Sequence, residues 1–159
     1  MIQYKKLQKL ADHLRRGKLG HLKFDFSCIN SDDPQMELKE GKVTVRPCGT
    51  SGCAMGELPI LFPKDWEYPE PEVLGIDSDG YVEVDLPAEP EPLFETHGNG
   101  LEESVAEFFG ISLGAANHLF YPHHQDTEQF GGVELDGKAT KLQVAKNIEA
   151  FIAKMKGKK

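Results

Sequence analysis

The residues 101–120, "LEESVAEFFGISLGAANHLF", decide the fold class of this chain, because they predict two short helices joined at a tight corner. Glycine is common at the C-terminal end of a helix, so Gly110 is expected to end the first one. Serine is a preferred N-cap residue, so Ser112 is expected to begin the second one. The apolar positions of the two halves recur at helical spacing; they are Val105, Ala106, Phe108 and Phe109, then Leu113, Ala116, Leu119 and Phe120. This pattern favours a mainly helical protein.

The same stretch is similar in spacing to a DNA-binding helix-turn-helix, from Ala106 through Gly110 to Ser112. A recognition helix needs Arg, Lys, Asn or Gln to reach bases and phosphates. The second helix offers only Asn117 and His118, and no Lys or Arg occurs from 101 to 137. We therefore interpret the corner as a packing motif with Ile111 in the core, and nucleic acid is a disfavoured partner.

Two further long helices are expected near the ends of the chain. Residues 3–16 place Tyr4, Leu7, Leu10, Ala11 and Leu14 on one face, with Gly17 as a stop. The last helix opens with Thr140 and Gln143 in capping-box spacing. Its predicted buried face contains Ala145, Ile148, Phe151, Ile152 and Met155.

Short strands complete the expected fold. Asp79-Gly80 is a two-residue turn signal between Val73–Ile76 and Tyr81–Leu86, which predicts a hairpin. Phe24–Cys28 and Val43–Val45 alternate as strands do, and residues 50–58 are predicted as a short helix capped by Thr50. We expect an α+β fold, a mainly helical single domain over 1–159 with a small antiparallel sheet or hairpin.

Composition narrows the function classes. The chain has 159 residues, a net charge of −8 and a pI near 5.2, which argues against binding to duplex nucleic acid. No apolar run reaches membrane-spanning length, and the amphipathic first residues do not form a secretory signal. Three sparse cysteines fit a reducing compartment. We expect a cytoplasmic protein.

An acidic, proline-rich insert at about 63–95 is the most distinctive surface feature. It holds many acids against a single base, Lys64, so a basic protein partner is expected. Trp66 is interpreted in two ways, as an exposed anchor for that partner or as a ring folded onto the edge of the core. The predicted interaction residues are Trp66, Glu67, Glu70, Glu72, Glu89 and Glu91.

The segment 47–56, "PCGTSGCAMG", has four interpretations. A metal site would use Cys48, Cys53, His123 and His124, although structural zinc sites usually have two close ligand pairs. A thiol active site would use Cys48 beside a helix start. An anion cradle would use Gly49, Thr50, Ser51 and Gly52. The favoured interpretation is tight packing of small residues, since cysteine behaves as a small buried hydrophobe.

Histidines gather after the second of the two predicted central helices. His118, His123, His124 and Asp126 lie close in sequence, and such a cluster can bind a metal or respond to pH. The alternative is that they are simply solvated, as neighbouring histidines in a loop usually are. We predict residues 121–137 as a loop.

Three stretches together resemble a family of small uncharacterised bacterial and phage proteins: "CGTSGCAMG", "FFGISLGAANHLFYP" and "TKLQVAKNIEAFI". That family shares a CGT-x-x-CA-x-G core and an FFG(I/L)…LF stretch, and the resemblance covers about half of the chain. It implies no activity and no cofactor. It implies that one group of residues acts together: Cys48, Gly49, Thr50, Cys53, Ala54 and Gly56.

These observations favour a small non-enzymatic interaction protein with an acidic surface facing its partner. The alternative is a protein that binds a phosphate or nucleotide ligand, or a thiol enzyme, centred on Cys48–Gly52. The sequence leaves the oligomeric state open, and it predicts no cofactor.

Overall fold

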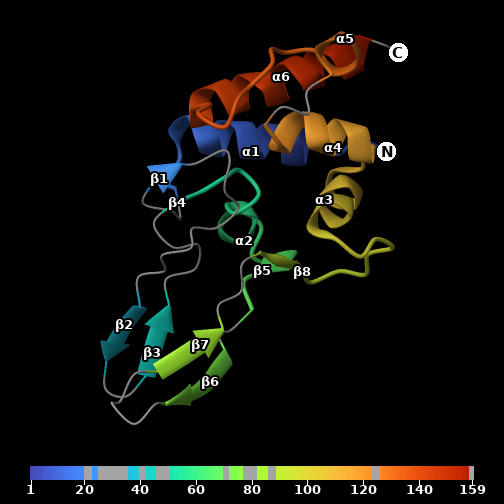
Figure 1. Ribbon diagram of the computed structural model, residues 1–159. Helices are drawn as coiled ribbons and strands as arrows, with labels where there is room; N and C mark the ends of the chain where they lie inside the picture. The colour runs from blue at the N-terminus through green and yellow to red at the C-terminus, as the bar shows by residue number, and fades with distance from the viewer. Residues whose placement is uncertain are drawn as a thin grey trace.

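The computed structural model describes residues 1–19, 23–24, 36–39, 42–45, 51–69, 72–76, 82–85, 89–122 and 126–157. Its elements confirm a mainly helical α+β fold with small antiparallel hairpins. In Figure 1 the helices gather at one end of the molecule, and two of the hairpins lie at the other end. No helix within the described ranges is long and apolar enough to cross a membrane.

Helices α1 (Tyr4–Arg16) and α6 (Lys141–Gly157) pack against each other, and α6 also contacts α4 (Figure 1). The predicted apolar face of α1 is confirmed, because Leu7, Leu10, Ala11 and Leu14 are all fully buried. The predicted face of α6 is also buried except for Met155, which is half-buried. The capping box is present: the Thr140 N–H donates to Gln143 Oε1 at 2.8 Å, and the Gln143 N–H donates to Thr140 Oγ1 at 3.3 Å.

The central corner forms as predicted from α3 (Leu101–Phe109) and α4 (Leu113–Phe120). Gly110 has a φ of 64°, and a Cβ there would collide with the Met1 carbonyl. Both the backbone conformation and the lack of space therefore require glycine at this position. The Ser112 side chain accepts from the Ala115 N–H at 3.2 Å. Ile111 is half-buried against the core, whereas Leu113, which was predicted to be buried, is exposed.

The described residues form four two-stranded pairs. β2 (Met36–Lys39) pairs with β3 (Lys42–Val45), and β6 (Glu72–Ile76) pairs with β7 (Val82–Asp85), both antiparallel. The second pair confirms the predicted hairpin, whose turn lies outside the described residues. β5 (Trp66–Glu67) pairs antiparallel with β8 (Glu91–Pro92) and thereby ties the two ends of the acidic insert together.

The predicted helix over 50–58 is wrong. Ser51–Gly52 form β4, which pairs in parallel with β1 (Lys23–Phe24), and a turn follows over 54–57. The helix α2 (Leu58–Leu61) begins where the predicted one was to end. Pro59 lies in its first turn, where proline needs no N–H partner.

The expected loop over 121–137 contains a short helix, α5 (Thr127–Phe130). Asp126 caps it by accepting from the Gln129 N–H at 2.8 Å. Phe130 is buried and lies against the ring of Phe151 on α6, with centroids 6.0 Å apart. This apolar anchor explains why a polar stretch still packs on the bundle.

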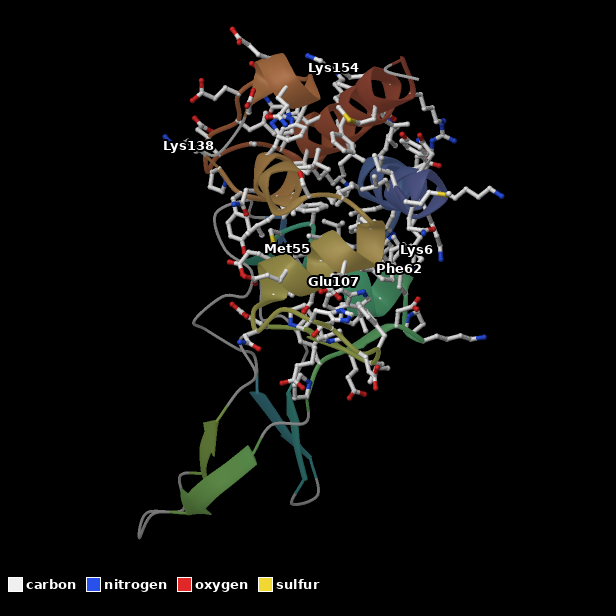
Figure 2. The ribbon with its side chains drawn as sticks, turned by 90° about the vertical axis from the view of Figure 1, so that its right-hand side faces the viewer. Lys6, Met55, Phe62, Glu107, Lys138 and Lys154 are labelled. Atoms are coloured by element: carbon white, nitrogen blue, oxygen red, sulfur yellow. The ribbon has the colours of Figure 1, made fainter. Side chains whose placement is uncertain are left out.

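Aromatic rings join α1, α2 and α3. Phe108 contacts Phe62 and Trp66 edge to face, at centroid distances of 5.0 and 5.6 Å. The Lys6 amine lies 3.7 Å above the centre of the Phe108 ring, a cation–π contact. Figure 2 shows Lys6 and Phe62 on the same side of the helical end of the molecule. The Lys9 amine donates to the Leu61 carbonyl at 2.9 Å. This cluster holds α3, and with it the loop before α3, in a fixed position.

Candidate functional site

A groove of about 490 Å³ lies beside the N-terminus of α3. One wall is the extended segment 89–92, and the other is the loop 96–100 with the first turn of α3. Its lining residues are Glu89, Pro90, Glu91, Pro92, Thr96, Gly98, Asn99, Gly100, Leu101 and Ser104. Two of the predicted interaction residues, Glu89 and Glu91, therefore line a concave surface.

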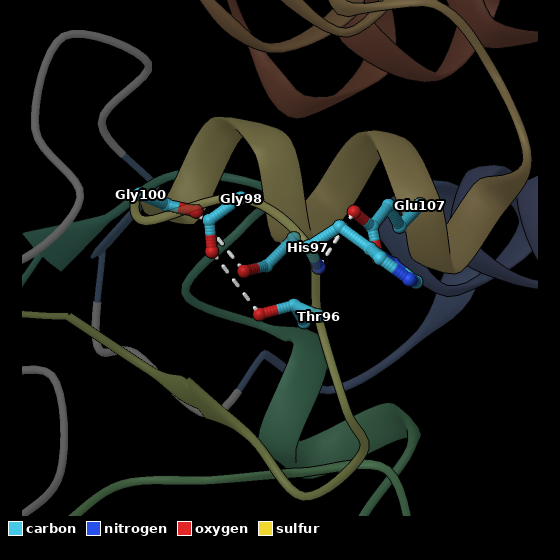
Figure 3. Close-up of polar contacts among 6 residues, drawn as sticks. Thr96, His97, Gly98, Gly100 and Glu107 are labelled. Carbon is cyan, nitrogen blue, oxygen red and sulfur yellow. Dashed lines mark hydrogen bonds and ion pairs between the residues drawn. The ribbon is translucent and has the colours of Figure 1, made fainter.

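The loop before α3 is held by hydrogen bonds to the helix (Figure 3). The His97 N–H donates to Glu107 Oε1 at 2.9 Å, and the Thr96 hydroxyl donates to the Gly98 carbonyl at 3.2 Å. The hydroxyl of Ser104 donates to the Gly100 carbonyl at 3.0 Å. The hydrogen bond from the His97 backbone is the main reason that the pKa of Glu107 is lowered. These bonds fix one wall of the groove before any ligand arrives.

Glycine is needed at position 98 of this loop because the Cβ of Glu103 approaches it closely, whereas at Gly100 the nearest atom is the flexible end of the Glu103 side chain. A Cβ added at Gly98 would collide with the side chain of Glu103, and one added at Gly100 would lie 2.5 Å from Glu103 Oε2. Two carboxylates, Glu102 and Glu103, thus stand in the first turn of α3, where they complement the positive end of the helix dipole. This helix end is already supplied with negative charge, which disfavours binding of an anion.

The groove is electrostatically negative. Burial, followed by the nearby Glu102 carboxylate, raises the pKa of Glu89. Glu102 accepts a hydrogen bond from the Tyr121 hydroxyl at 2.8 Å. Burial raises the pKa of Tyr121, and Glu102, Cys53 and Glu89 add to this shift. No lysine or arginine lines the described walls, so the carboxylates are available to a cation supplied from outside.

The other predicted interaction residues whose side chains the structure describes do not line the groove. Trp66 is only 1% exposed and packs on Phe94 and Phe108, so the interpretation as an exposed anchor is wrong and the alternative of a ring folded onto the core holds. Glu67 is exposed on β5. Glu72 lies on β6, and Glu70 lies outside the described residues.

Part of the cysteine segment lies outside the described residues, namely Cys48, Gly49 and Thr50, as do His123 and His124. Ser51 and Gly52 lie on β4, and Cys53 is buried. Within the described ranges, no group of three or more His, Cys, Asp or Glu side chains is placed to hold a metal ion. The metal, thiol and anion interpretations of this segment stay predictions.

Sequence reasoning missed a buried pair just after the cysteine segment. The Glu57 carboxylate is fully buried, and its Oε2 lies 2.7 Å from Nε2 of His13 on α1. One signal was available: His13 lies at the edge of the apolar face of the predicted first helix, beside Leu10, and a titratable group that is partly buried there requires a partner. The pair fastens the segment after β4 to α1.

Comparison of the chain with protein-family models, with curated proteins and with solved structures gave no match. The resemblance to small bacterial and phage proteins therefore stays a prediction.

Proposed function

We propose that the protein is a small non-enzymatic binding protein whose acidic groove holds a basic segment of a partner protein. The groove is the space of about 490 Å³ between residues 89–92 and the start of α3. The observation that carries the proposal is that Glu89 and Glu91 line this groove, while no lysine or arginine is among its described lining residues. Burial and the Glu102 carboxylate also raise the pKa of Glu89. A site in which carboxylates repel one another is relieved when a cation binds.

The chain itself supplies few cations that compete for this site. No lysine or arginine occurs in the sequence between Lys64 and Lys138, and this stretch holds most of the 26 acidic residues. An arginine side chain suits the groove best, because its planar guanidinium can donate two parallel hydrogen bonds to one carboxylate. The expected partner therefore presents arginine or lysine on an extended segment or loop.

The volume of the groove agrees with this use. Binding pockets for small groups and side chains usually enclose several hundred cubic ångströms. The polar edges provided by Thr96 and Asn99 can orient a peptide backbone, while Pro90 and Leu101 offer apolar surface to the stem of a long basic side chain. The fixed loop 96–100 reduces the ordering that binding would otherwise require.

The first test measures binding of a dye-labelled oligo-arginine peptide by fluorescence anisotropy at physiological salt. We expect the double variant Glu89→Gln/Glu91→Gln to bind about tenfold more weakly, since two charge-assisted contacts are lost. The matched control is Glu134→Gln/Asp136→Asn, which removes the same charge from a different hollow of about 370 Å³ near α6. The control should stay within about twofold of the unaltered protein.

Equal weakening in both double variants would contradict the proposal, because it would show attraction by net charge alone. Carbodiimide cross-linking of the bound peptide adds a positional check when the peptide carries a terminal lysine. Cross-links are expected at Glu89 or Glu91, and cross-links confined to other carboxylates would also contradict the proposal.

A further inference from the structure

His118 has an unusual environment for a titratable side chain. It is fully buried on α4, and among the described residues neither of its ring nitrogens has a hydrogen-bond partner. The ring of Phe130 from α5 lies against it, with centroids 5.3 Å apart. Phe130 in turn contacts Phe151 of α6. The imidazole therefore sits in the apolar contact where α4, α5 and α6 meet.

Few charged groups surround this imidazole. Among the described residues, Asp126 faces it from the start of α5 and Lys154 faces it from α6. Burial is the main cause that lowers the pKa of His118, and Lys154 lowers it further, while the Gly131 backbone and Asp126 oppose the shift. The ring is therefore neutral at neutral pH, which suits its apolar surroundings.

The segment that covers His118 is attached by a small number of contacts. The Lys154 amine donates to the carbonyls of Thr127 and Glu128. The Asn147 side chain accepts from the Val133 N–H at 3.0 Å and donates to the Val133 carbonyl at 2.7 Å. α5 has only four residues, too few for a helix to be stable alone. Its docking depends on these contacts and on the ring of Phe130.

We propose that His118 makes the docking of residues 126–133 dependent on pH, so that protonation of its imidazole releases α5 from α4 and α6. An imidazolium has two N–H donors that need acceptors, and neither ring nitrogen has a hydrogen-bond partner among the described residues. The Lys154 amine repels the new charge, and the Gly131 backbone and the Asp126 carboxylate only partly offset this repulsion and the cost of burial. Lifting Phe130 away admits water to the ring without disturbing the contact between α1 and α6.

The direction of the effect follows from proton linkage. The released form binds a proton at the ordinary pKa of histidine, about 6.5, whereas the docked form binds it only at lower pH. Docking is therefore weakened as the pH falls below about 6.5 and is restored as the pH rises. A change of this kind lies in the range that cells use for pH signals.

Hydrogen exchange tests the proposal directly, at about pH 7.5 and about pH 5 with correction for intrinsic rates. The informative amides are Phe130, Gly131 and Val133, which donate to Asp126 O, Thr127 O and Asn147 Oδ1 in the docked form. Their protection is expected to fall at least about tenfold at the lower pH, while the amides of α1 and of the middle of α6 keep theirs. A parallel loss across α1 and α6 would overturn the proposal.

The variant His118→Leu should abolish this pH dependence. The matched control is His97→Gln, which removes a histidine that is 95% exposed and paired with Glu107 at 3.4 Å; this variant should behave like the unaltered protein. Unchanged pH dependence in His118→Leu would refute the proposal. If that variant does not fold, NMR titration of the unaltered protein decides: His118 must titrate with the same midpoint as the loss of protection, and titration without that loss refutes the proposal.

Discussion

Two regions in the described part of the protein each contain a fully buried titratable side chain. They differ in whether that side chain has a polar partner. Between α1 and α2, the Glu57 carboxylate meets the imidazole of His13 at 2.7 Å. Where α4, α5 and α6 meet, His118 has no hydrogen-bond partner among the described residues and packs against Phe130. The stability of the first region depends on the partner of the buried charge. The stability of the second region depends on the buried imidazole remaining neutral, because it has no hydrogen-bond partner there.

The largest effect is expected from breaking the first region. His13→Leu leaves the fully buried Glu57 carboxylate without its imidazole, and loss of one member of a buried pair costs about 3–5 kcal/mol of unfolding free energy. Urea unfolding near neutral pH measures this. The control is Glu149→Gln, which breaks the half-exposed pair with Arg15 at 2.5 Å and should cost about 0.2–1 kcal/mol. Similar losses in both variants would show that burial of Glu57 adds nothing.

The variant Asn147→Ala, in the second region, is expected to lower the free energy of unfolding by an intermediate amount. The Asn147 side chain is 2% exposed and makes hydrogen bonds to both backbone groups of Val133. Its removal loses these two bonds, and at about 0.5–1.5 kcal/mol each we expect a cost of about 1–3 kcal/mol. Thermal unfolding measures the loss. Asn117→Ala on α4 is the control, since the Asn117 side chain makes no hydrogen bond among the described residues. A control that is equally destabilised would contradict the role of Asn147.

The smallest effect is expected from His118→Leu at about pH 7.5. The neutral ring makes no hydrogen bond to lose, and swaps of similar volume in a core usually change stability by less than about 1.5 kcal/mol. Measured against His13→Leu, this variant sharpens the contrast between the two regions. A loss as large as that of His13→Leu would mean that the imidazole of His118 is held by specific polar contacts.

The features that were correctly predicted from the sequence depend on residues close together in the chain. The capping box spans only Thr140 to Gln143, and the corner needs only Gly110 with its φ of 64° and the Ser112 cap. The pairing of β6 with β7 was predicted from the Asp79-Gly80 signal and the alternation beside it. Each of these signals is complete within a few residues, so no knowledge of the rest of the fold is required.

The features that were missed depend on partners far apart in the chain. His13 and Glu57 are 44 residues apart. Ser51–Gly52 form a strand rather than a helix because Lys23–Phe24 pair with them, which overrides the local preference for a helix start. The sequence indicated that Glu89 and Glu91 face a partner, yet the groove they line also needs the loop 96–100, whose position is set by Glu107. Trp66 was ambiguous because an aromatic ring among prolines and acids fits both a core and a surface.

The burial of Trp66 also has a practical consequence. It is the single tryptophan of the chain, it packs edge to face against both Phe94 and Phe108, and no acceptor in the described part of the structure receives its indole N–H. Its cross-strand neighbour, Pro92, lines the acidic groove. Intrinsic fluorescence excited selectively at tryptophan is therefore a label-free probe at one known position. Its emission should lie toward the blue in the folded protein and respond to a ligand that presses on Pro92.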